Sequence, residues 1–179
     1  MFRYNLAAGI SFSKEMVLKK LFTILSLAAI LATSSLAQWT VTNLHPAGTT
    51  VSFADGIGGG QQAGWATVGG VQHASLWNGT PASWVDLDPA GAFTSGAHAT
   101  HSGQQVGFVN AGSGPRASLW YGTAASRLNL NPAGASESVA FDINGSQQVG
   151  YSELGGAKHA GLWNSTAASW IDLHPAGTS

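Results

Sequence analysis

Six histidines are the residues of this sequence that are best suited to bind a metal or to move a proton. His98 and His101 are the closest pair, and on a strand their odd separation places them on opposite faces, where they would not hold one ion. His73 and His159 occupy equivalent positions of a repeat in which Arg116 takes the third place, so a packing or surface polar role suits them better than catalysis. We therefore predict no metal site and no cofactor.

Other reactive groups are missing or isolated. The sequence has no cysteine, which removes disulfides, thiolate metal ligands and a cysteine nucleophile together. No serine lies in a G-x-S-x-G elbow, and the carboxylates are mostly scattered, without a recurring histidine and serine beside them. The chain is therefore predicted not to be an enzyme.

Aromatic rings beside polar groups form the best candidate binding surface. Trp84 and Trp170 share a repeat position with Arg127, and a position that tolerates arginine is expected at the solvent edge. Rings in such a place could stack on a sugar while neighbouring carboxylate or amide groups hydrogen-bond its hydroxyls. The predicted ligand-binding residues are Trp84, Asp86, Arg127, Asn129, Trp170 and Asp172.

These positions recur because the chain is built from a repeat. Four prolines, Pro46, Pro89, Pro132 and Pro175, are spaced 43 residues apart, and the register between them holds without insertion or deletion. The same interval relates three Gln-Gln pairs, three Leu-Trp pairs and the Leu-x-Pro runs. A period of this length indicates supersecondary units that stack and share a core. The predicted wedges between the units are Trp77, Trp120 and Trp163.

Each unit divides into four strand-like segments. In the last unit these are 138–143, 147–152, 159–163 and 170–174, separated by turn dipeptides such as Asn144-Gly145. No segment after residue 37 keeps a 3.6-residue period, so we predict an all-β domain with essentially no helix. Three four-stranded, 43-residue repeats fit the blades of a partial β-propeller, which three units cannot close alone, or a β-trefoil, which closes within one chain.

The first 37 residues contain the three parts of a secretory signal. Lys19 and Lys20 form a basic start, an apolar run follows, and Ser35-Leu36-Ala37 places small residues at a cleavage site. The apolar run is shorter than the roughly 18 residues that span a bilayer, and Met16 is an alternative start. We predict a signal peptide at 1–37 and a repeat domain at 38–179, with a leading strand at 39–46 and units at 47–89, 90–132 and 133–175.

The third unit contains Ile143-Asn144, then Gln147-Gln148-Val149-Gly150-Tyr151, then His159-Ala160-Gly161-Leu162-Trp163. This pattern resembles the bacterial extracellular HAF-type repeat, named for a His-Ala-Phe run before Leu-Trp. The resemblance covers residues 39–179 and implies propeller-like blades and an exported location, without an activity to transfer. The chain departs from the motif where its phenylalanine is Ser75, Ser118 or Gly161, and where its histidine is Arg116. The motif favours the propeller over the trefoil, which the repeat count favours.

Composition narrows the partners. Residues 38–179 hold three basic and seven acidic residues, a net charge of −4, so no basic patch exists for nucleic acid or for anionic lipid. We expect a secreted or periplasmic, non-enzymatic repeat module that binds a ligand or partner, with carbohydrate as one candidate, and no membrane span after signal removal. The alternatives are a structural, self-assembling surface protein and, with less support, a hydrolase. Uncovered end faces and sheet edges also predict a homo-oligomer.

Overall fold

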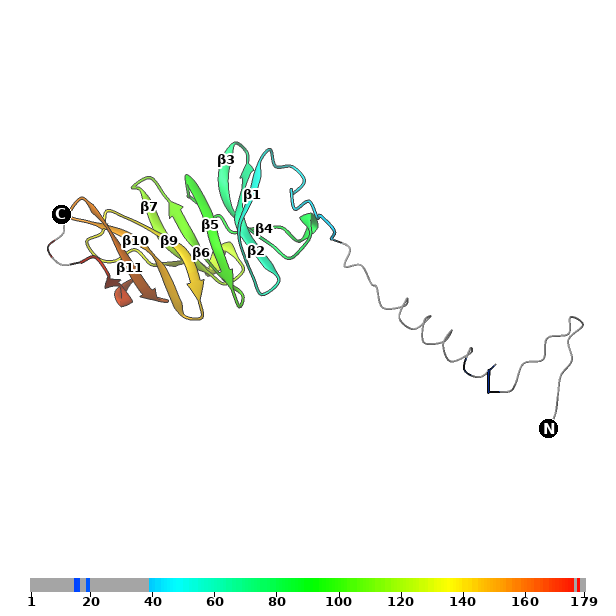
Figure 1. Cartoon of the computed structure of the whole chain (residues 1–179). Coiled ribbons are helices and arrows are strands. Elements are labelled where there is room, and N and C mark those ends of the chain that lie inside the picture. The colour runs from blue at the N-terminus through cyan, green and yellow to red at the C-terminus, as the bar shows by residue number, and fades with distance from the viewer. Residues whose placement is uncertain (1–14, 17–18, 20–38, 176, 178–179) are drawn as a thin grey trace, which may run out of the picture. The chain divides into compact units, whose positions relative to one another are not determined.

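The computed structural model describes residues 15–16, 19, 39–175 and 177. The chain divides into two compact parts, residues 1–41 and residues 42–179. The strands lie in the part formed by residues 42–179 (Figure 1). The signal peptide predicted for residues 1–37 falls almost entirely outside the described residues and stays a prediction.

Residues 42–179 contain three antiparallel sheets, and each sheet consists of four consecutive strands in sequence order. Sheet 1 contains β1 (Ser52–Gly58), β2 (Gln61–Val68), β3 (Val71–Trp77) and β4 (Val85–Asp86). Sheet 2 contains β5 (Thr94–His101), β6 (Gln104–Asn110), β7 (Pro115–Trp120) and β8 (Leu128–Asn129). Sheet 3 contains β9 (Glu137–Asn144), β10 (Gln147–Leu154), β11 (Ala157–Asn164) and β12 (Ile171–Asp172).

The last strand of every sheet follows a short 3-10 turn, which the sequence analysis did not anticipate. The three turns are η1 (Pro81–Ser83), η2 (Ala124–Ser126) and η3 (Ala167–Ser169). In η1 the Ser83 hydroxyl accepts the N–H of Asn78 at 2.7 Å and donates to the carbonyl of Thr80 at 2.6 Å. These turns are the helical segments of residues 39–175, so the expectation of an all-β domain is confirmed.

A β-bulge interrupts the first strand pair of every sheet, and a repeated glycine makes room for it. The register shifts next to Gly64, Gly107 and Gly150 on the second strands. A Cβ on any of these glycines would lie 1.9 Å from a carbonyl oxygen of the first strand, a distance that no side chain tolerates. This position of the repeat therefore requires glycine.

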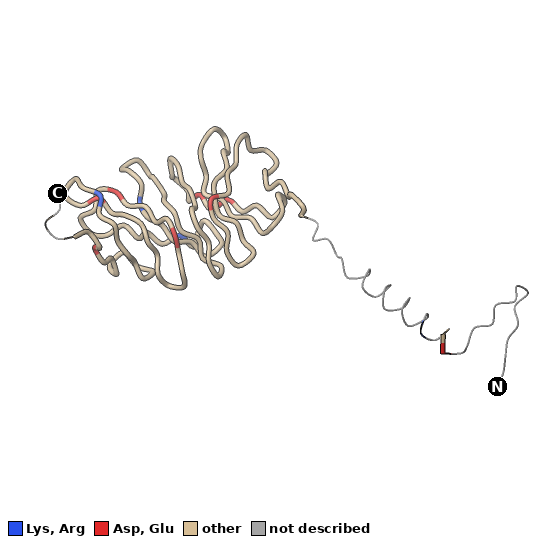
Figure 2. Tube along the Cα trace, in the orientation of Figure 1, with Lys and Arg blue, Asp and Glu red and all other residues tan. Residues whose placement is uncertain are grey.

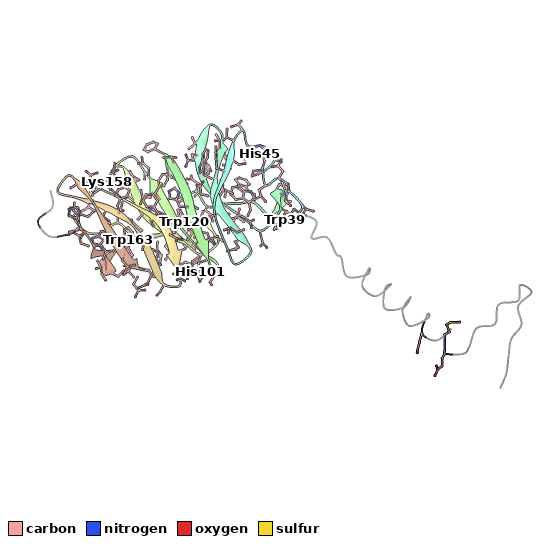
Figure 3. All side chains as sticks on the ribbon, viewed as in Figure 1. Trp39, His45, His101, Trp120, Lys158 and Trp163 are labelled. Carbon is pink, nitrogen blue, oxygen red and sulfur yellow. The ribbon has the colours of Figure 1, made fainter. Side chains whose placement is uncertain are left out.

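Apolar residues fill two seams, one between each pair of consecutive sheets. In the first seam, Leu76 and Leu87 of the first unit pack with Trp120 of sheet 2. In the second seam, Leu119 and Leu130 of the second unit pack with Trp163 of sheet 3. Figure 3 shows the two tryptophans in successive sheets. The predicted core role of the recurrent tryptophans is confirmed, because at most 1% of the surface of Trp77, Trp120 or Trp163 is exposed.

The three sheets stack face to face in sequence order, an open arrangement that fits a partial propeller. Each repeat forms a sheet of its own, whereas the repeats of a trefoil share one closed barrel, so the trefoil alternative is not the fold. In the last unit all four predicted strands hold to within two residues at each end. The leading strand predicted at 39–46 is not formed, because the first strand within residues 39–175 begins at Ser52.

Candidate functional site

The six predicted ligand-binding residues lie at equivalent positions of the three sheets. Asp86, Asn129 and Asp172 end the short outer strands β4, β8 and β12, and the ring or guanidinium residue stands two positions earlier. We call these three places the rim. The structure therefore brings the residues together in pairs, one pair to each sheet: Trp84 with Asp86, Arg127 with Asn129, and Trp170 with Asp172.

The large side chain of each rim pair is half-buried over the third strand of its own sheet. Trp84 donates its Nε1–H to the Ser75 hydroxyl at 2.9 Å, and Arg127 donates its Nε–H to Ser118 at the same distance. Burial lowers the pKa of Arg127. In sheet 3 the equivalent of those serines is Gly161, which leaves space for the Trp170 ring. The rim residues thus brace the outer strands.

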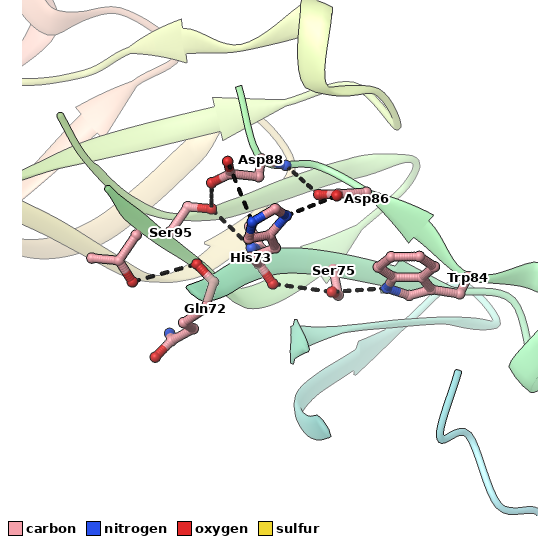
Figure 4. Close-up of polar contacts among 9 residues, drawn as sticks. Gln72, His73, Ser75, Trp84, Asp86, Asp88 and Ser95 are labelled. Atoms are coloured by element: carbon pink, nitrogen blue, oxygen red, sulfur yellow. Dashed lines mark hydrogen bonds and ion pairs between the residues drawn. The ribbon is translucent and has the colours of Figure 1, made fainter. Parts of the chain in front are cut away.

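A histidine and two aspartates form a polar cluster at the rim of sheet 1 (Figure 4). His73 Nδ1 lies 2.8 Å from Asp86 Oδ2, and Asp86 Oδ1 accepts the backbone N–H of Asp88 at 2.8 Å. His73 Nε2 is 3.9 Å from Asp88 Oδ2. Because both oxygens of Asp86 have partners, this carboxylate is engaged in holding β3 to β4.

Sheet 3 repeats the same arrangement with a more exposed carboxylate. His159 Nδ1 lies 2.7 Å from Asp172 Oδ2, and the N–H of His174 donates to Asp172 Oδ1 at 2.8 Å. These two hydrogen bonds, the one with His159 first, lower the pKa of Asp172. The rings of His159 and His174 stack with centroids 4.2 Å apart.

The middle sheet lacks the histidine–aspartate pair, and this is a signal that the sequence analysis missed. Arg116 replaces the histidine and donates instead to the carbonyl of Ser136 in the following unit, while Asn129 replaces the aspartate. Two repeat positions thus change together: the first is histidine in the sheets where the second is aspartate, and neither residue stands at these positions in the middle sheet. Comparing two columns of the repeat, rather than each alone, would have predicted the contact.

Of the closest histidine pair, His98 stands at the bulge of β5, beside an aromatic group. His98 Nδ1 is 3.7 Å from Asp55 Oδ2 of β1, and the His98 ring lies 5.8 Å from Phe108 and 5.6 Å from Phe141. Burial lowers the pKa of His98, although Asp55 opposes the effect. Within the described residues no group of three or more His, Cys, Asp or Glu is placed to hold a metal ion.

A serine at the start of each later sheet latches it to the sheet before, a second feature that the sequence analysis missed. The Ser95 hydroxyl accepts the N–H of Ala74 at 2.8 Å and donates to Asp88. Ser138 accepts the N–H of Ala117 at 2.9 Å and donates to Asn131 at 2.6 Å. Both serines are buried, so each latch satisfies polar groups inside a seam.

One side of sheet 3 departs from the pattern of the other two sheets. It is the side that corresponds to the one by which sheets 1 and 2 contact the following sheet, and we call it the outward side of a sheet. In the first two units, four apolar positions of this side are covered by the following sheet. In the third unit the same positions are open or half-open: Val149 is 43% exposed, Leu173 is 57% exposed, Ala160 is exposed and Leu162 is half-buried. We call these four residues the open face.

Few charges accompany these surfaces, and Figure 2 shows them scattered along the sheets. No helix among the described residues is long and apolar enough to cross a membrane. A scan against protein-family models found no match for the chain, and searches of curated proteins and of solved structures found none either. The resemblance to the HAF-type repeat therefore stays a prediction from sequence.

Proposed function

We propose that this chain is an exported, non-enzymatic repeat module that acts by binding a protein partner on the open face. The observation that carries the proposal concerns one leucine that occurs at the same position of all three repeats. Leu87 and Leu130 are fully buried, while Leu173 is 57% exposed in the same structural position. A contiguous apolar patch of this kind is typical of an interaction surface. Fully burying one leucine contributes about 1.5–3 kcal/mol, so a partner that covered the patch would gain substantial affinity.

Export is supported by the sequence pattern before residue 38 and by the resemblance to an extracellular repeat family. N-terminal sequencing of exported protein tests it. A mature chain that begins near Gln38 is expected, whereas one that still begins at Met1 or Met16 would contradict the proposal of export.

Carbohydrate binding at the rim is a second candidate. Its supporting observation is that Trp84 and Trp170 remain half-buried, with ring positions fixed by the serine hydroxyl or by Trp163, whose ring centroid lies 4.5 Å from that of Trp170. A ring held in place loses little entropy when a sugar stacks on it. Against this candidate, the carboxylate oxygens of Asp86 and Asp172 already form hydrogen bonds with other groups of the protein.

One pair of experiments separates the two candidates. Residues 38–179 are applied to a glycan array and, in parallel, immobilised as bait for exported proteins of the producing cell. A variant with Leu162→Asp and Leu173→Asp removes the open face, and a variant with Trp84→Ala and Trp170→Ala removes the rim rings. We expect protein capture that only the first variant loses. Glycan binding that only the second loses would move the function to the rim.

A matched control keeps the capture experiment specific. Leu128 is 43% exposed and its equivalents Val85 and Ile171 are exposed in the other units, so Leu128→Asp adds charge without touching a seam position. If the wild type, the Leu128→Asp protein and the open-face variant capture the same proteins, the proposed function fails.

A further inference from the structure

The two seams inside the chain show what covers a face of this kind. In both, the outward side of one sheet is buried by the first strand of the next sheet and by its tryptophan. Sheet 3 presents the same four columns as sheets 1 and 2. The surface that best fits the open face is therefore one built like the inward side of sheet 2 or sheet 3.

Sheet 1 has such an inward side, and it is partly uncovered. Ala97 and Ala140 are fully buried in the seams, while Ala54 in the same column is exposed. Ile143 is 6% exposed, while its equivalent Ile57 is 78% exposed. The two ends of the stack thus carry the two halves of one seam.

The latch is also divided between the two ends. Ala160 occupies the column of Ala74 and Ala117, whose N–H groups donate to Ser95 and Ser138. Ser52 occupies the column of those serines, and its hydroxyl lies 2.9 Å from His45 Nδ1. Donor and acceptor of a third latch are therefore present, at opposite ends of the chain.

The segments that flank this latch are identical in sequence. Leu44-His45-Pro46-Ala47-Gly48-Thr49 and Leu173-His174-Pro175-Ala176-Gly177-Thr178 have the same six residues, whereas the internal junctions have Asp88 or Asn131 in place of histidine. His174 can therefore hold Ser52 of another copy as His45 holds it within one chain. An identical element that can be exchanged between copies is a low-cost route to association.

We propose that the open face binds sheet 1 of a second copy in the register of the internal seams, and that two such contacts close a ring of six sheets. Leu173 to Pro175 of one copy then replaces Leu44 to Pro46 of the other, and Ser52 accepts the N–H of Ala160. Six sheets fall within the usual range of four to eight propeller blades. This inference rests on the proposed function, because it names the partner of the same face.

The ring makes a prediction that symmetric pairing of two open faces does not. Variant A carries Leu162→Asp and Leu173→Asp, and variant B carries Ile57→Asp. In a head-to-tail ring each variant alone is monomeric, because every seam then includes one damaged side. Mixed together, A supplies an intact sheet 1 and B an intact open face, so they form one seam and a 1:1 complex.

Native mass spectrometry and light scattering on residues 38–179 at micromolar concentration give the readout, with circular dichroism to confirm that each variant is folded. We expect a wild-type dimer, a Leu128→Asp control that remains a dimer, and dissociation constants raised about 100-fold or more in A and in B. Ser52→Ala should weaken the dimer by roughly tenfold or less, the value of one hydrogen bond. Leu44→Asp should tighten it, because it loosens the segment that must be replaced.

Several outcomes would overturn the inference: a wild-type monomer, a dimer that survives in A or B, failure of A and B to combine, polymers that grow with concentration, or an affinity that Leu44→Asp leaves unchanged or lowers. A wild-type monomer whose open face still captures a different protein would refute the second copy and leave the proposed function standing. A monomer that captures nothing would refute both.

Discussion

Leu130 and Leu173 have the same place in the repeat, the same neighbours along the chain and opposite environments. Leu130 is sealed between sheets 2 and 3, while 57% of the surface of Leu173 is exposed. The difference indicates that the repeated apolar positions are buried by the contact between two sheets and not by the single sheet that carries them. Each sheet supplies one side of an interface, so its contribution to the free energy of unfolding depends on the surface that packs against it.

The sharpest way to test this comparison is to remove the largest side chain of a seam. Trp120→Ala should lower the free energy of unfolding by about 3–5 kcal/mol, as large aromatic truncations in cores do. Trp170→Ala should cost much less, because the rim ring is only half-buried. Chemical denaturation followed by tryptophan fluorescence gives both values. Equal losses for the two variants would contradict the distinction between seam and rim.

The leucine column gives the most direct comparison. Leu130→Ala should destabilise the protein by about 2–5 kcal/mol, and Leu173→Ala by no more than about 0.5 kcal/mol, when both are measured at concentrations too low for copies to associate. A loss at Leu173 as large as that at Leu130 would mean that the open face is covered within the single chain.

The latch serines offer a polar version of the same test. Ser138→Ala leaves the N–H of Ala117 and the side chain of Asn131 without their buried partner, so we expect a loss of about 1–3 kcal/mol. Ser52→Ala should change the stability of the dilute chain by less than about 0.5 kcal/mol, because that latch has only its acceptor half there. Thermal melts of the two variants side by side measure the contrast.

The smallest effect concerns pH and His98. Burial lowers the pKa of His98 in the folded chain, so the unfolded chain takes up a proton more readily. Stability should therefore fall as pH drops through the unfolded-state pKa of 6.5 toward the lowered folded value. His98→Gln should flatten the dependence of Tm on pH between about 7.5 and 5. An unchanged slope would show that His98 is not responsible.

Asp172 acts in a separate window. Its pKa is lowered in the folded chain, so its contribution is present above the unfolded value of 3.8 and is lost as pH falls below it. Measurements above about pH 5 therefore report on His98 without interference from this carboxylate.

The fold followed from sequence because the repeat has no insertions. Turn dipeptides such as Gly155-Gly156, with φ of 60° and 87°, fixed the hairpins, and the recurring Leu-Trp pairs fixed the core. The 3-10 turns escaped prediction because alanine and serine carry little local preference, and the turn depends on the Ser83 hydroxyl closing back on Thr80. Excluding the trefoil needed the strand pairing itself.

The candidate site was harder to predict, for a physical reason. Trp84, Arg127 and Trp170 each precede the outer strand of a sheet, but the polar partners of Trp84 and Arg127 are third-strand residues that only the register reveals. The latch between Ser95 and Ala74 joins residues 21 positions apart across two sheets, so no local pattern marks it. Whether the rim binds a ligand stays a prediction.

The construction of each sheet from consecutive strands also bears on how the chain folds. Hydrogen bonds between the sheets join residues only 20 to 44 positions apart, as in Arg116 to Ser136 and Gln105 to Gln61. Contacts of such short range carry a low loop-closure cost, which favours fast folding for an all-β protein. As in other repeat proteins, we expect that any of the three sheets can serve as the nucleus and that order then spreads to its neighbours one unit at a time.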